Sequence, residues 1–491
     1  MKRITWKKHH KWFGIIFAFF MLMFCLSGIV LNHRALVADI NIDRSFLPAD
    51  YRYNKWNMGL LRGSIKCKDK VLIYGNSGIW KTDSTGHSFS DFNKGLPAGA
   101  DFRNIKAMVQ TPDGSLFAAG QFGLYRNDGK GWESTPLKFS KHERISDLVL
   151  KGDTMVVVGR SYLYTSVNPY NEFGRLELKA PEGYDGNVSL FRTVWLMHSG
   201  EMFGTLGKLV MDTVAVILIL LCLTGIAYWL LPKYIRKIRM SGKTAKGSTQ
   251  LMKTSLNWHD KLGRYTFLIL IFVAFTGWCL RPPVLIALVS FRTPAIPYTV
   301  ADSYNAWNDR LRMLRYDAEF DDWILSTSEG FYSMATLRSV PVRLEKTPPV
   351  SVMGLNVWQK DSCGNWLAGS FSGMYVWDRD KNASFDYFSG EKAEDVSGPP
   401  FGKFAVSGYC DNIGEKPFVV EYHNGTSAIP MPEDFSCLPM SLWNFAQEIH
   451  TGRIYTVLGQ GTLVYIFFAG MAAMWCIYTG FVIRRKKQNR T

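Results

Sequence analysis

The sequence predicts an α-helical membrane protein in which four transmembrane helices, related by internal duplication, carry an all-β domain on the extracytoplasmic side. Three observations predict this fold class: four apolar runs, basic clusters at their ends, and a strand-turn phrase repeated in the two long segments between the runs. We expect both segments together to close one β-propeller, and two separate β-sandwiches are the alternative.

The charge of the chain is concentrated at the ends of the apolar runs. The 491 residues are 47% hydrophobic and carry a net charge of +16. Residues 1–11, 232–264 and 484–491 hold 5, 9 and 5 basic residues and a single acid, Asp260. The rest of the chain is therefore slightly acidic, which excludes a basic groove for nucleic acid. The positive charge instead gives the membrane topology.

Each apolar run is long enough, or nearly so, to cross the ~30 Å hydrocarbon layer of a lipid bilayer. The runs are 12–31, 213–231, 265–280 and 454–483. The first has no small-residue cleavage site, so we expect a retained anchor and not a signal peptide. Because Lys and Arg favour the cytoplasmic side, both termini are expected inside, in a multi-pass protein of the cell inner membrane. The expected order is N-terminus and first span 1–33, outer β segment 34–197, second span 198–232, cytoplasmic loop 233–258, third span 259–290, outer β segment 291–449, fourth span 450–483 and cytoplasmic tail 484–491.

Two histidine-glycine patterns occur once in each half of the chain. His10-x3-Gly-x13-Gly returns as His259-x3-Gly-x13-Gly, with Ser or Thr before the second glycine. His198-x-Gly returns as His450-x-Gly, and a further glycine follows each at the same distance. The two patterns and the similar lengths of the outer segments predict that the chain is two copies of helix, outer segment and helix.

The outer segments are predicted to be β-structure. One motif recurs in them: a strand is followed by a turn of small residues and then by glycine, a hydrophobic residue and an aromatic residue. Its spacing is typical of propeller blades. The four clear copies are 71–80, 117–125, 324–332 and 367–375, and the two weaker copies are 156–164 and 419–427.

The eight cysteines divide equally between the apolar runs and the outer segments. An isolated cysteine in a membrane helix is usually a small packing residue. The outer four form an even number in a compartment that permits disulfides, and Cys410 with Cys437 is the pairing we expect first.

Four histidines in symmetric register predict two haem sites. His10 and His259 are expected at one cytoplasmic depth, and His198 and His450 at one height on the outer side. Neutral imidazole is a ligand of haem iron, and facing helices can hold a porphyrin between two histidines. We therefore predict two haem b groups, with each pair ligating one iron. The alternative for a single histidine at a helix end is an interfacial side chain.

Two glycines are predicted to adjoin the first haem. Gly14 and Gly263 lie one helical turn after His10 and His259, where the missing side chain would let a flat macrocycle approach the backbone. Close packing of membrane helices through small residues is an equally good interpretation.

The predicted separation of the two pairs raises a question of distance. A continuous helix from His198 to Lys233 would be ~50 Å long. Either the helices break at the glycines that follow the outer histidines, or His33 on the first helix helps to bind the outer haem. His33 is kept as a reserve ligand, and His9 as a substitute for His10.

These motifs resemble the PepSY-associated transmembrane family. The resemblance rests on His-x3-Gly with a distal Ser/Thr-Gly and on His-Ser/Thr-Gly, and it covers the four helices and their flanks. Family members include bacterial ferric-siderophore reductases with four helices and two haems. The resemblance implies outward electron transfer, whereas the outer segments show propeller-like repeats in place of a recognisable PepSY domain.

The expected function is reduction of a periplasmic ferric siderophore or related iron chelate for iron acquisition. No Gly-x-Gly-x-x-Gly fingerprint follows a strand, so quinol or a separate reductase is the expected donor. No side chain is singled out as catalytic beyond the haem ligands. The alternative is a sensor or partner-binding membrane protein without redox activity. A transporter is disfavoured because the helix centres are almost entirely apolar.

Overall fold

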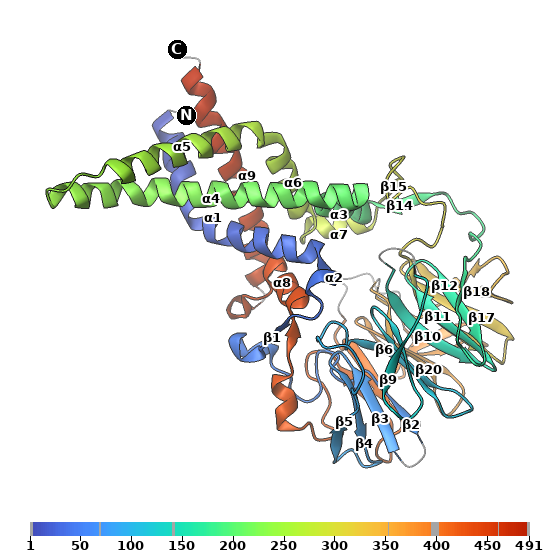
Figure 1. The fold of residues 1–491 in the computed structure, drawn as a ribbon. Coiled ribbons are helices and arrows are strands. Elements are labelled where there is room, and N and C mark those ends of the chain that lie inside the picture. The colour runs from blue at the N-terminus through green and yellow to red at the C-terminus, as the bar shows by residue number, and fades with distance from the viewer. Residues whose placement is uncertain are drawn as a thin grey trace. The chain divides into compact units, whose positions relative to one another are not determined.

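The chain folds into two units, each built from segments that are far apart in sequence (Figure 1). The structure is a computed structural model that describes residues 3–67, 70–139, 143–351, 353–393, 402–459 and 461–488. The helical unit comprises Met1–Val37, Gly186–Asp302 and Trp443–Thr491, and the β unit comprises Ala38–Asp185 and Ser303–Leu442.

Three helices of the helical unit are long and apolar enough to cross a membrane, by length and composition. They are α1 (Arg3–Asn32), α4 (Gly204–Met240) and α9 (Gly461–Gln488). The predicted third span is half of a bent pair, α5 (Lys246–Tyr265) and α6 (Phe267–Cys279), whose axes differ by 70°. Helix α1 packs against α4 and α9, α4 against α5, and α6 against α9. The protein is therefore a membrane protein with three candidate spans, or four if the bent pair crosses as one.

Two of the predicted spans begin later than expected, because glycines separate the outer histidines from the long helices. His198 lies in α3 (Leu190–Ser199), which ends at Gly200 with φ 76°, and His450 lies in α8 (Leu442–Thr451), followed by Gly452 with φ 75°. A left-handed residue of this kind ends a helix, and glycine adopts it without a steric penalty. The sequence left two alternatives for the long distance between the histidine pairs, a helix break at these glycines or ligation by His33. The structure shows the helix break.

The predicted cytoplasmic loop 233–258 is mostly helical. Helix α4 continues to Met240 and α5 begins at Lys246, so only 241–245 connects them. Figure 1 shows the two as a long antiparallel hairpin. The predicted tail 484–491 lies partly outside the described residues, and its described part continues α9 to Gln488. The remaining helices of this unit are α2 (Arg34–Val37) and α7 (Val284–Val289), and its one described sheet pairs β14 (Asn187–Ser189) with β15 (Arg292–Pro294).

The β unit contains five four-stranded antiparallel sheets, each made of consecutive strands. The first three are β2 (Gly63–Cys67), β3 (Lys70–Gly75), β4 (Gly78–Thr82) and β5 (Phe89–Asp91); β6 (Ile105–Gln110), β7 (Leu116–Gly120), β8 (Leu124–Asn127) and β9 (Trp132–Thr135); and β10 (Ile145–Lys151), β11 (Thr154–Gly159), β12 (Leu163–Val167) and β13 (Gly174–Leu176). The other two are β16 (Leu311–Asp317), β17 (Asp322–Thr327), β18 (Gly330–Met334) and β19 (Val342–Arg343); and β20 (Leu355–Lys360), β21 (Trp366–Ser370), β22 (Gly373–Asp378) and β23 (Ala383–Asp386). Strands β24 (Val406–Cys410) and β25 (Phe418–Glu421) form a two-stranded sheet, as do β1 (Asn41–Ile42) and β26 (Met440–Ser441).

The repeated sequence motif, a strand, a turn and Gly-hydrophobic-aromatic, corresponds to the second and third strands of a sheet. Its glycine starts the third strand at Gly78, Gly330 and Gly373, with φ between 123° and 148°, a range open mainly to glycine. The weak copy at 156–164 is also such a strand pair, whereas the copy at 419–427 contributes β25 and one isolated bridge.

The two outer segments share buried cores. One apolar cluster joins Val156 and Leu163 to Trp307 and Leu325, and another joins Trp56 to residues near the end of the second segment. The first strands of the sheets contact one another in the order β2, β6, β10, β16, β20, β24 and again β2. The two segments therefore form one domain, and the alternative of two separate sandwiches is wrong.

All eight cysteines lie in the described part of the chain, and all are free thiols. The expected Cys410–Cys437 pairing is wrong: Cys410 is buried in the core, whereas Cys437 is exposed. Burial raises the pKa of the Cys410 thiol to about 12, so it behaves as a small apolar side chain.

Candidate functional site

The structure brings the four predicted histidine ligands together in two pairs. The ring centroids of His10 and His259 are 5.9 Å apart, and those of His198 and His450 are 6.1 Å apart. Two metal-nitrogen bonds of ~2 Å, with ~1.1 Å from each nitrogen to its ring centroid, place two ligating imidazoles ~6 Å apart. Each pair therefore leaves the space of one metal ion between its rings.

Each histidine is held by a Ser-Gly or Thr-Gly pair of a membrane helix. The Nδ1 atom lies 3.1–3.3 Å from the hydroxyl oxygen and bonds to the backbone carbonyl three residues earlier. The four combinations are His10 with Thr479-Gly480, His259 with Thr224-Gly225, His198 with Thr276-Gly277 and His450 with Ser27-Gly28.

This arrangement fixes the tautomer of the ring, as His450 illustrates. The Ser27 hydroxyl donates to the Met23 carbonyl at 2.6 Å, and the Phe24 carbonyl, 3.0 Å from Nδ1, can only accept. Nδ1 must therefore carry the proton, which leaves the lone pair on Nε2, the usual metal-binding nitrogen. A carbonyl behind a ligating histidine also orients the ring and raises its basicity.

The glycine of each pair makes room for the imidazole. A Cβ built at Gly28 or Gly225 would lie 3.3 Å from the Cε1 of the neighbouring histidine, and at Gly480 or Gly277 the distance would be 2.9 Å or 2.7 Å. A side chain at these positions would push the ring away from the carbonyl, so the small residue belongs to the site itself.

Every histidine is supported by a helix from the other half of the chain. His10 and His198 belong to the first half and contact α9 and α6 of the second. His259 and His450 belong to the second half and contact α4 and α1 of the first. Neither half could build either pair alone.

The sequence pattern located two of the four supporting pairs and missed the other two. Ser27-Gly28 and Thr276-Gly277 belonged to the recognised repeat, but their contact with the outer histidines was not foreseen. Thr224-Gly225 and Thr479-Gly480 were not singled out. Their signal was the recurrence of a Ser-Gly or Thr-Gly dipeptide in each of the four apolar runs.

Gly14 and Gly263 lie where helices pack together, and the described atoms nearest to a built Cβ belong to Cys476 and Leu221. A Cβ at Gly14 would meet the Cys476 sulfur at 3.6 Å, and one at Gly263 would meet Leu221 at 3.7 Å. Cys476 and Leu221 supply the carbonyls that accept from His10 and His259. Of the two interpretations offered by the sequence, the described contacts are those of helix packing.

His33 lies with Asp212 and not with either pair. Its Nε2 is 2.7 Å from Asp212 Oδ2, and Asn32 donates to the other carboxylate oxygen at 2.9 Å. His9 lies beside His10 in sequence, but its ring contacts Phe13 and Trp475.

In the part of the chain that the structure describes, a cation without a carboxylate partner lies near the second pair, and polar atoms without hydrogen bonds lie near the first. Arg281 donates to the His450 carbonyl at 3.2 Å, and no carboxylate of the described residues lies within ion-pair distance of it. Beside His10, the buried atoms Trp6 Nε1 and His9 Nδ1 have no hydrogen-bond partner in the described chain. Orphaned polar atoms near the first pair and a cation near the second are compatible with an anionic group at each site.

The two pairs are separated by most of the membrane thickness. His10 and Ser27, which contacts the second pair, are ~26 Å apart along α1 at 1.5 Å per residue. This compares with a hydrocarbon layer of ~30 Å. Aromatic rings in contact lie along the intervening helix: Phe13 with Phe17, Phe17 with Phe20, and Phe24 with His450.

The donor set suits a macrocyclic metal group and not a bare ion. The described residues include no cluster of three or more His, Cys, Asp or Glu side chains able to hold a metal. A porphyrin would supply four nitrogens, and the two imidazoles of each pair would complete the ligand set of its iron.

The matches among known proteins include one family and several solved structures, of which two are described below. The profile of the PepSY-associated TM region matches residues 126–487, whereas no curated protein matches the chain. The extracellular domain of a protein described as a hybrid two component system from B. thetaiotaomicron is 10% identical, with a TM-score of 0.32, over 73% of this chain and 36% of that one. The extracellular domain of a one component system from the same organism is 9% identical, with a TM-score of 0.23, over 65% and 33%. The chain spans about a third of the length of these two.

Proposed function

The chain belongs to the family of the PepSY-associated TM region, and from this premise we propose that it binds two haem b groups and reduces an extracytoplasmic ferric chelate. The observation that supports the proposal best is the spacing of the histidine rings, 5.9 and 6.1 Å, with Nδ1 of each ring directed at a backbone carbonyl. When bound, haem b supplies a one-electron Fe(III)/Fe(II) couple.

The proposed ligands are His10 and His259 at one site and His198 and His450 at the other. The carbonyl and hydroxyl behind each ring hold it in one tautomer and one orientation. Arg281 would balance a propionate at the second site, and Trp6 and His9 would donate to one at the first.

For the β unit we propose a six-bladed propeller on the extracytoplasmic side. The cyclic order of contacts between first strands supports it, since β24 returns to β2. The basic segments 1–11, 232–264 and 484–491 support cytoplasmic termini in the inner membrane. Electrons would then enter from quinol or a separate reductase near His10 and leave near His198.

The proposed acceptor is a ferric siderophore or a related iron chelate. The hard oxygen donors of such chelates bind Fe(III) far better than Fe(II), so one-electron reduction releases the metal. The helices supply the path, and the β unit would select the chelate.

The test is a haem assay on the purified full-length protein, followed by turnover in oriented vesicles. We expect two haems per chain, low-spin spectra, and quinol-dependent capture of Fe(II) by an impermeant chelator on the side of the β unit. Protein without haem after expression with ample haem supply would overturn the proposal and favour the redox-inactive sensor or partner-binding protein.

Substitutions at two glycines should distinguish a glycine that makes room for a histidine ring from one that lets two helices pack closely. In Gly277→Ala the new Cβ would lie 2.7 Å from His198 Cε1, so we expect about half of the haem to be lost or to become high-spin. The matched control is Gly263→Ala, whose Cβ would make an ordinary 3.7 Å contact with Leu221. Absorption and electron paramagnetic resonance spectra report the difference, and two equal spectra would contradict the assigned contact.

A further inference from the structure

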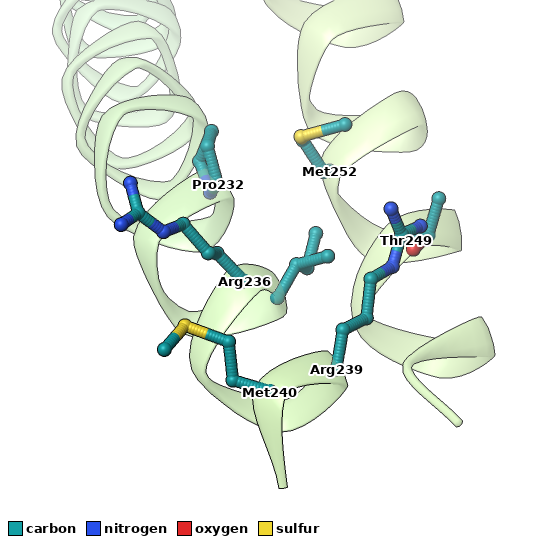
Figure 2. Close-up of a pocket in the computed structure, with 7 residues that line it drawn as sticks. Pro232, Arg236, Arg239, Met240, Thr249 and Met252 are labelled. Carbon is teal, nitrogen blue, oxygen red and sulfur yellow. The ribbon is translucent and has the colours of Figure 1, made fainter. Parts of the chain in front are cut away.

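A pocket of about 470 Å³ lies between the C-terminal part of α4 and the N-terminal part of α5. Pro232, Ile235, Met240 and Met252 provide apolar walls. Figure 2 shows the Arg239 side chain of α4 extending toward Thr249 of α5, whereas the Arg236 side chain extends over α4 on the side away from α5; both arginines are among the lining residues. Two guanidinium groups at an apolar cavity fit an anionic amphiphile.

The arginines of this pocket have no acidic partner among the residues that the structure describes. The only acid of segment 232–264 is Asp260, and it lies 3.6 Å from Arg264, one turn away on the same helix. Nine basic residues in this segment leave a net charge of +8. The Thr249 hydroxyl donates to the Ala245 carbonyl at 2.8 Å, so its oxygen can accept a further hydrogen bond.

If α4 crosses the bilayer and Lys233 marks the edge of the hydrocarbon layer, the pocket would lie near the depth of the lipid headgroups. The Lys233 ammonium is 4.4 Å from the centroid of the Trp229 ring, and a Trp-Lys contact at the end of an apolar run is typical of the membrane interface. At 1.5 Å per residue, Arg236 and Arg239 lie ~5–9 Å beyond Lys233 along α4. The headgroup layer on each side of a bilayer is ~5–8 Å thick.

We propose that this pocket binds the headgroup of an anionic phospholipid. Arg236 and Arg239 would hold the phosphate by charge-assisted hydrogen bonds, and the acyl chains would leave along the apolar surface of α4. An acidic soluble protein is a poorer occupant, because half of the pocket wall is apolar side chain. The bound lipid would fix the helix α5 that carries His259, although the proposal does not depend on haem.

The test uses the full-length protein in nanodiscs of phosphatidylcholine with or without phosphatidylglycerol. Native mass spectrometry should find phosphatidylglycerol retained on the wild-type protein. The double variant Arg236→Gln/Arg239→Gln should retain it about tenfold less well, since both phosphate contacts are lost. The control Lys243→Gln/Lys253→Gln removes the same charge from two equally exposed positions of the hairpin that do not line the pocket, and it should behave as the wild type.

Three outcomes would overturn the proposal. Equal loss in the control would indicate general attraction to a charged surface, and equal retention of phosphatidylcholine would show that the pocket does not select anions. Displacement of the lipid by millimolar inorganic phosphate would assign the pocket to free phosphate. Haem content, measured on the same samples, should not change, so failure here is distinguishable from failure of the proposed function.

Discussion

Replacement of His450 by alanine should halve the haem content of the purified protein and abolish reduction of the external ferric chelate. The second pair then has one imidazole, whereas His10 and His259 keep their support from α9 and α4. The remaining haem should still be reduced by quinol. Reduction of the remaining haem should therefore continue while reduction of the ferric chelate stops. In one sample of oriented vesicles, haem absorbance reports the first reaction and an impermeant Fe(II) chelator reports the second.

The control for this experiment is His33→Ala. His33 was the reserve ligand from the sequence, but its Nε2 contacts Asp212 at 2.7 Å. We expect this variant to keep both haems. If His33→Ala lost one haem and His450→Ala kept two, His33 of α1 would have to replace His450 as the proposed ligand of the second site.

Arg379→Leu should destabilise the β unit by about 3–5 kcal/mol, the usual cost of leaving a buried carboxylate without its cation. Arg379 lies 2.7 Å from Asp317 Oδ2 and binds both oxygens of Asp322 at 2.7–2.8 Å. Asp317 keeps Lys360 at 2.9 Å, whereas Asp322, which is 8% exposed, has no other cation among the ion pairs of the described residues. Urea unfolding followed by tryptophan fluorescence would measure the free energy.

The matched control is Lys381→Leu, which breaks an ion pair with Asp378 at 2.8 Å in the same sheet. The Lys381 side chain is 76% exposed, so the expected loss is below about 1 kcal/mol. Similar losses in the two variants would contradict the role given to burial.

The same cluster predicts an acid-sensitive β unit. Burial alone would raise the pKa of Asp317, but hydrogen bonds from Trp366, Lys360 and Arg379 outweigh it and hold the pKa at about 2. A carboxyl whose pKa is lower in the folded state stabilises fully above its unfolded value of about 4. This contribution, about 2 kcal/mol, should be lost as the pH falls from about 4 to 2. Unfolding curves at several pH values should show the loss in the wild type, and a flat profile would contradict it.

The sequence by itself determined the parts of the protein whose signals are local. Apolar length and basic flanks marked α1, α4, α9 and the broken α5–α6 pair. Gly-hydrophobic-aromatic repeats marked the strand pairs, since a third strand that starts at positive φ requires glycine. The register of His10, His198, His259 and His450 identified the candidate ligands, because the same His-Gly spacings recur in both halves of the chain.

The tertiary structure alone decided how these parts combine. The partners in the His450 and His10 sites are 423 and 469 residues apart, and spacing along a chain does not say which helix a ring will face. The break after His198 was one of two solutions until Gly200 was found at φ 76°. Cys410 and Cys437 were candidates for a disulfide because the outer segments contain an even number of cysteines. In the structure one is buried and the other is exposed, so both are free thiols. Local chemistry fixes which residues can act, whereas packing between distant segments fixes which of them meet.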